Sequence, residues 1–159
     1  MDTSSSPNKS IIESHEVTLF IEGNEVFHAD LDKLAIIAEY SLPATSENWG
    51  HYIVLILSDG CYIEWPTEAT YSKQAVQTLE AFLKMKLPMS LCSANTLSSR
   101  IIWPPNLMGN EAILFKVQTK SIMDKISRIF ASPRFSLHWS DAVLAQISID
   151  QPEPGRMQM

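Results

Sequence analysis

A run of apolar residues that folds back on itself dominates the hydrophobic pattern at residues 51–65. Residues 52–57 are apolar on both faces of a strand, which is typical of a strand buried inside a sheet. Asp59 and Gly60 follow, and they predict a two-residue hairpin loop because Gly60 adopts positive φ without a steric clash. The expected cross-strand pairs are Leu57 with Tyr62, Leu55 with Glu64 and Val54 with Trp65.

A second hairpin is predicted in residues 12–28, where apolar and polar positions alternate. Gly23 and Asn24 supply its turn, so that Ile21 is expected to face Val26. The same register brings Glu22 opposite Glu25, a like-charge pair that is tolerable where both carboxylates are solvated.

Residues 31–40 fit two interpretations. Asp30 is a good N-cap residue, and the apolar spacing after it favours a helix that ends before Pro43. A buried strand is the alternative, because Ile36 and Ile37 spoil a one-sided helix.

The second half of the chain alternates between helices and short strands. Residues 70–86 have an apolar stripe at helical spacing, with Glu80 and Lys84 in the favourable order, and this helix is expected to cover a face of the sheet. Short strands are predicted over residues 89–92, 99–103, 112–117 and 135–139, and a second amphipathic helix between Ser121 and Pro133. Residues 140–149 fit either a last helix or a last strand.

These elements predict an α+β fold with a mainly antiparallel sheet of about five to seven strands and two or three helices packed on it. A chain of 159 residues is expected to form one domain, here residues 11–149. Residues 1–10 are expected to be a disordered tail and residues 150–159 a flexible one.

The charges are distributed unevenly. The chain carries a net charge of −6, of which residues 1–68 contribute −10 and residues 69–159 contribute +4. An acidic half repels phosphate, so nucleic acid is not expected as a partner. No apolar run reaches the length of a membrane helix, and the N-terminus lacks the apolar region of a secretory signal, so a cytoplasmic protein without membrane contact is expected.

Motifs that carry chemistry are absent from the sequence. The five glycines are scattered and form no phosphate-binding loop, and no cofactor is expected. His28, Asp30 and Asp32 alternate as metal ligands on a strand could, but a solvated strand end with a helix cap explains them better. Cys61 lacks the surroundings that activate a thiol, so a buried core cysteine is the better interpretation. The protein is therefore expected not to be an enzyme.

Acidic and aromatic residues are the candidates for partner binding. Tryptophan at strand ends and loops is often found at interfaces, although it also seals the ends of cores. Glu64 is expected on an otherwise apolar face, where it either emerges at an edge or meets a partner. The candidate partner-binding residues are Glu22, Glu25, Asp32, Glu47, Trp49, Glu64 and Trp65.

The function expected from these features is a non-catalytic protein-interaction module. One version is an inhibitor of the immunity or antitoxin kind. In this version an acidic surface docks on another protein that is basic, and the attraction between opposite charges speeds association. One alternative is a small enzyme or small-molecule binder with a pocket between sheet and helix near Glu64, His51 or Cys61. The other is a structural subunit of an assembly. Oligomeric state is not determined by these patterns.

Overall fold

The computed structural model of the chain describes residues 9–21, 23–44, 50–68, 72–91, 94–117 and 135–147. The strands are β1 (Lys9–Glu13), β2 (Glu16–Ile21), β3 (Asn24–Asp30), β4 (Leu34–Leu42), β5 (Gly50–Leu57), β6 (Tyr62–Pro66), β7 (Ser98–Trp103), β8 (Ile113–Val117) and β9 (Phe135–Trp139). The helices are the 3-10 helix η1 (Leu31–Lys33) and the α-helices α1 (Ser72–Leu83) and α3 (Asp141–Gln146). The predicted helix at residues 70–86 and the last three predicted strands are confirmed.

The nine described strands form three antiparallel sheets. Their orders are β1–β2–β3, β6–β5–β4–β7 and β8–β9. The expected α+β, mainly antiparallel character is confirmed. The expectation of a single sheet of about five to seven strands is wrong, because local alternation predicts strands but not which of them share an edge. Among the described residues the helices also differ from the expectation, since residues 34–40 of the segment expected to be helical belong to β4.

β4 is the element for which the favoured prediction is wrong and the alternative is correct. Only the short helix η1 follows Asp30, whose carboxylate caps it by accepting a hydrogen bond from the Asp32 N–H at 2.9 Å. Every residue from Leu34 to Leu42 is buried, and β4 pairs with β5 on one side and β7 on the other. A strand with both faces covered needs apolar residues on both sides, which explains why Ile36 and Ile37 stand together.

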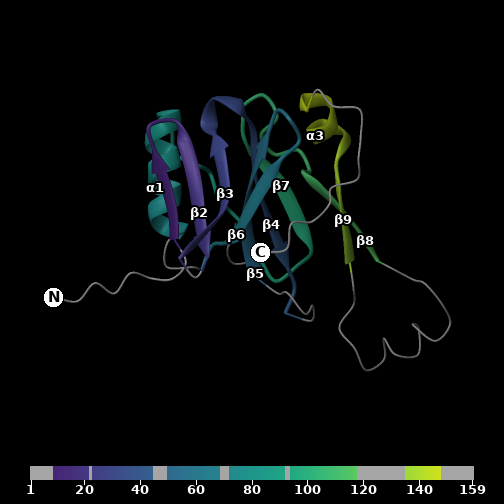
Figure 1. Cartoon of the computed structure of the whole chain (residues 1–159). Helices are drawn as coiled ribbons and strands as arrows, with labels where there is room; N and C mark the ends of the chain where they lie inside the picture. The colour runs from purple at the N-terminus through teal and green to yellow at the C-terminus, as the bar shows by residue number, and fades with distance from the viewer. Residues whose placement is uncertain are drawn as a thin grey trace.

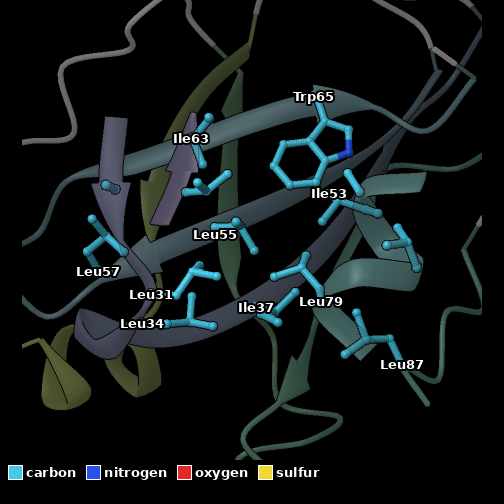
Figure 2. Close-up of a cluster of buried hydrophobic side chains, with 14 of the residues drawn as sticks. Leu31, Leu34, Ile37, Ile53, Leu55, Leu57, Ile63, Trp65, Leu79 and Leu87 are labelled. Atoms are coloured by element: carbon cyan, nitrogen blue, oxygen red, sulfur yellow. The ribbon is translucent and has the colours of Figure 1, made fainter. Parts of the chain in front are cut away.

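Two different layers cover the faces of the four-stranded sheet (Figure 1). On one face lie α1 and the sheet β1–β2–β3, and on the other lie β8, β9 and α3. The first layer and the sheet enclose a core that Figure 2 shows. In this first core, Ile37 and Ile53 of the sheet lie in one cluster with Leu79 of α1 and Leu31 of η1.

The second core lies between the other face of the sheet and the layer of β8, β9 and α3. Its buried residues include Ile36, Val54, Ile101, Ile113 and Val143. Ser140 starts α3, because its side chain accepts a hydrogen bond from the Val143 N–H at 3.4 Å. The choice left open for residues 140–149 is therefore decided in favour of a helix over Asp141–Gln146.

The central hairpin between β5 and β6 has a three-residue loop, so the predicted two-residue loop is wrong. The Leu57 N–H donates to Cys61 O at 2.8 Å, and the Gly60 N–H donates to Leu57 O at 3.0 Å. Gly60 has a φ of +83°, as the left-handed position of such a loop requires. The observed pairs are Leu55 with Ile63, Val54 with Glu64 and Ile53 with Trp65. A one-residue shift exchanges the two faces of a strand, so Glu64 lies on the face opposite to the predicted one.

The hairpin between β2 and β3 also differs in register from the prediction. Ile21 pairs with Asn24 and Phe20 with Glu25. The expected pairing of Glu22 with Glu25 is therefore wrong. Gly23, with φ +80°, stands in the turn itself.

The end of α1 shows why one predicted ion pair does not form. Lys84 has a φ of +55° and leaves the helix, and the Met85 N–H closes the last turn by donating to Glu80 O at 3.1 Å. Glu80 therefore pairs with Lys86, whose Nζ lies 2.7 Å from Glu80 Oε2, rather than with the expected Lys84.

The remaining predictions concern residues 1–10, 89–92 and 121–133 and the expected lack of a membrane helix. β1 begins at Lys9, inside the segment 1–10 expected to be a tail. Residues 89–91 contain no strand, so the strand predicted over 89–92 is wrong for the residues that the structure describes. The helix predicted between Ser121 and Pro133 lies outside the described residues. In the described part of the chain, no helix is long and apolar enough to cross a membrane.

The loop of the central hairpin gives a stability prediction. Gly60→Ala should lower the free energy of unfolding by about 1 kcal/mol, because a Cβ disfavours the left-handed conformation. Urea unfolding followed by circular dichroism measures the change. Ser58→Ala in the same exposed loop is the matched control and should change stability by less than about 0.5 kcal/mol. Equal effects of the two variants would contradict the observed loop conformation.

Candidate functional site

The exposed face of the sheet β1–β2–β3 carries a row of three carboxylates. Glu13 pairs with Glu16, and Glu16 pairs with Asp30, so these residues lie side by side across the three strands. Their chain neighbours Val17 and Ala29 are buried in the first core, and side chains alternate along a strand, so the row faces away from the core. We call Glu13, Glu16 and Asp30 the acidic row.

Asp32 and two histidines lie at the same end of this sheet. His15 Nδ1 donates to Asp32 Oδ1 at 2.7 Å, and His28 Nε2 lies 3.6 Å from Glu16 Oε1. The hydrogen bond to Asp32, helped by the negative charges of Asp32 and Asp30, raises the pKa of His15 above its usual value. These pairs are exposed, so each contributes little to stability. We call the acidic row together with Asp32 the acidic end.

The acidic end is suited to recognising positive charge. Glu13, Glu16 and Asp32 are exposed, and Asp30 is half-buried. Lysine and arginine bind such carboxylates through charge-assisted hydrogen bonds. Among the described residues, no group of three or more histidine, cysteine or acidic side chains is placed to hold a metal ion.

Only one of the predicted partner-binding residues, Asp32, belongs to the acidic end. Glu25 is exposed at the other end of β3, beside the turn. The predicted residues Glu22, Glu47 and Trp49 lie outside the described residues. The sequence pattern did not single out Glu13 and Glu16, because their alignment with Asp30 depends on the register of β1, which overlaps the expected tail. The available signal was an acidic residue at one end of each strand, because Glu13 ends β1, Glu16 begins β2 and Asp30 ends β3.

Glu64 and Trp65 lie on opposite faces of the central sheet. Trp65 is 1% exposed, and its indole N–H donates to Ser72 Oγ at 3.1 Å, so this tryptophan seals the end of a core and does not lie at the surface. Figure 2 shows Trp65 in the first core. Glu64 is half-buried on the face that β8 and β9 cover, and its Oε2 accepts a hydrogen bond from the Tyr40 hydroxyl at 2.8 Å. The Tyr40 ring stacks on Tyr52, with centroids 4.9 Å apart.

The three residues considered for a pocket between sheet and helix do not converge. Glu64 lies on the face away from α1, whereas His51 alternates with Tyr52 and shares the face of Ile53. Cys61 is exposed, which corrects the expectation of a buried core cysteine. Partial burial of its thiol and the nearby Asp59 carboxylate raise the pKa of Cys61, so little of the nucleophilic thiolate is present at neutral pH.

Glu39 on β4 is the centre of a buried hydrogen-bond network, and its side chain is 0% exposed. Its Oε2 accepts from His51 Nε2 at 2.7 Å and from the Leu91 N–H at 3.3 Å. Its Oε1 accepts from Arg100 Nε at 2.7 Å and from the Ser90 N–H at 2.9 Å. One carboxylate thereby ties β4 to β5, to β7 and to the irregular segment after α1.

The network keeps Glu39 ionised. Burial by itself would raise its pKa, but the hydrogen bonds from His51, the Ser90 N–H and Arg100 outweigh burial and lower the pKa to about 2. Relative to an ordinary carboxyl group, this corresponds to about 3 kcal/mol of stability at neutral pH. The sequence signal for this network is a single charged residue within the otherwise uncharged segment Leu34–Leu42.

Comparison with known proteins assigns this chain to no family. No protein-family model, curated protein or solved structure matches it significantly. Its function is therefore inferred from the charges and contacts described above.

The Glu39 network predicts a pH-dependent stability difference. Glu39→Gln should lower the free energy of unfolding by about 3 kcal/mol at neutral pH, because it leaves Arg100 and His51 without their buried carboxylate. The stabilisation by the wild-type carboxylate is complete above the unfolded-state pKa and is lost as the pH falls toward the folded-state pKa of about 2. The difference between the two proteins should therefore shrink from about pH 5 to about pH 2.

Urea unfolding at a series of pH values tests this expectation. Glu111→Gln, at an exposed position, is the control and should stay within about 0.5 kcal/mol of the wild type throughout. A Glu39→Gln protein as stable as the wild type at neutral pH would show that the network contributes no net stability.

Proposed function

We propose that this protein is a non-catalytic protein-interaction module whose acidic end binds a basic surface of a partner protein. The observation that carries the proposal is the acidic row, in which three carboxylates lie side by side on an exposed face. Like charges directly opposite each other destabilise a sheet, so fold stability alone does not favour this row. A partner that supplies lysine or arginine relieves the repulsion when it binds.

The distribution of charge over the chain supports the same proposal. The acidic end belongs to residues 1–68, which carry a net charge of −10. Such a field attracts a basic protein over several ångströms and raises the rate of encounter. An inhibitor of the immunity or antitoxin kind is one version of the proposal, in which the basic partner is the protein that it blocks.

The network around Glu39 has a supporting role in this proposal. The hydrogen-bond donors of the network are satisfied within the protein. Thr67 Oγ1 lies 2.9 Å from His51 Nδ1, and the Thr67 hydroxyl donates to the main-chain oxygen of His51 at 3.1 Å. These contacts hold the central sheet together. The acidic end, in contrast, presents the carboxylates of Glu13, Glu16 and Asp32 to solvent.

Charge reversal tests the location of the binding surface. We expect the double variant Glu13→Lys, Glu16→Lys to bind an immobilised oligolysine peptide about tenfold more slowly than the wild type at low salt, because the acidic row then repels the peptide. Association rates of the full chain on a biosensor measure this effect, and added salt should diminish it.

The matched control is Glu68→Lys, Glu111→Lys, which changes the net charge equally at exposed positions outside the acidic end. It should reduce the association rate by no more than about twofold. Equal losses in the two double variants would mean that only overall charge matters, and the acidic end would no longer be the proposed site.

His15, which contacts the acidic end, predicts a pH dependence of binding. As the pH falls through the neutral range, His15 gains a positive charge beside Asp32, while lysine in the peptide stays protonated. Because Asp32 raises the pKa of His15, this change begins at higher pH than for an ordinary histidine. Oligolysine should therefore dissociate more readily at low pH, and His15→Gln should reduce that weakening. An unchanged pH profile in His15→Gln would argue against this role.

A further inference from the structure

β3 is an edge strand at the acidic end. Of the strands that the structure describes, only β2 pairs with it, and the order β1–β2–β3 leaves its other side without a partner strand. Edge strands carry main-chain groups that can pair with an added strand. Recognition by strand addition is one of the recurring ways in which proteins bind extended segments.

The hydrogen-bond pattern shows which groups of β3 face outward. The Leu31 N–H donates to His15 O, so His15 and Leu31 form a hydrogen-bonded pair at the end of the ladder. Bonded and non-bonded pairs alternate along an antiparallel ladder, which makes Thr18–His28 and Glu16–Asp30 non-bonded pairs. The main-chain N–H groups of His28 and Asp30 therefore point away from β2.

The regular part of this edge is short. The register of β2 and β3 shifts between Leu19 and Phe20, which leaves Val26 as a bulge, and η1 begins directly after Asp30. Bulges protect edges against indiscriminate pairing. The segment from Phe27 to Asp30 can therefore accept only a few main-chain hydrogen bonds, and binding here depends on additional charge contacts.

The charges along the edge of β3 determine which kind of strand can bind there. Residues directly opposite one another on paired strands lie on the same face, so a residue added opposite His28 or Asp30 projects its side chain on the face of the acidic row. A second copy of this chain, paired antiparallel through β3, would bring its own Glu25 and Asp30 into a row that is already acidic. A strand with lysine or arginine at alternating positions would instead neutralise it.

We propose that an extended segment of a basic partner, with lysine or arginine at alternating positions, binds as a fourth strand antiparallel to β3. This inference rests on the proposed function and specifies its binding mode. In this arrangement the basic residues stand opposite His28 and Asp30, and their main-chain N–H groups face β3. The intervening residues turn their N–H groups toward solvent.

The main-chain N–H groups of the added strand point in turn toward β3 and toward solvent, so two peptides methylated at one or the other set serve as matched probes. The parent probe is a short, end-capped peptide that alternates lysine and valine, and it is added to the 15N-labelled full chain. The parent peptide should shift the amide signals of His28 and Asp30. Methylation of the lysine main-chain nitrogens should weaken binding about tenfold, because it removes the donors that face β3. Methylation of the valine nitrogens should leave binding within about twofold.

Variants of the protein test the same contacts from the other side. His28→Pro removes one outward N–H without removing a ladder hydrogen bond, and proline is tolerated on such an edge. It should weaken parent-peptide binding about tenfold relative to His28→Ala, which also lacks the imidazole but keeps the N–H. If His28→Pro does not fold, binding of the two methylated peptides to the wild-type protein provides the test.

The outcomes separate this inference from the proposed function. Equal binding of both methylated peptides, combined with loss of binding in Glu13→Lys, Glu16→Lys, would overturn strand addition and leave the acidic end as a charge-recognition surface. Failure of the parent peptide to bind at millimolar concentration would overturn both. Shifts confined to amides outside β3 would also refute the strand beside it.

Discussion

A strand that is buried on both faces is the constraint on which the rest of this structure depends. β4 pairs along both edges, and every residue from Leu34 to Leu42 is buried. The chain therefore has to cover two faces of the same sheet, and it does so with two layers of different construction. The layer of α1 and β1–β2–β3 fills the first core, and the layer of β8, β9 and α3 fills the second (Figure 1).

The same strand holds a buried carboxylate around which three distant segments meet. Glu39 would be very costly in such an environment without partners, and its hydrogen bonds to His51, Arg100 and two main-chain N–H groups offset that cost. An apolar residue would pack in β4 as well, but it could not hold the irregular segment at Ser90 against the sheet. A polar group inside the core thereby determines where a segment without regular secondary structure lies.

The acidic end differs from this network in its exposure and in the repulsion among its carboxylates. Its carboxylates are largely exposed, and they repel one another across β1, β2 and β3. Among the described residues, His15 and His28 form the ion pairs that moderate their charge. It also lies beside the open edge of β3, so charge and main-chain hydrogen-bonding groups are available at the same place. The combination accounts for both proposals: charge draws a basic partner to this end, and the edge offers that partner a defined orientation.

Much of this architecture follows from the sequence alone, and the exceptions have a common cause. The apolar character of β5, the turn residue Gly60, the helix α1 and the strands β7, β8 and β9 are all consequences of local patterns of side chains. The tertiary structure decided that β4 is a strand, that Glu64 and Trp65 exchange faces, and that Glu13, Glu16 and Asp30 form one row. A local pattern shows how often apolar residues recur along the chain. The register of two strands depends instead on which strands pair and on the loop between them, where one residue more or less shifts every pair. For this reason the sequence determined most elements of the fold, whereas long-range pairing determined that β4 is a strand and how the charges are arranged.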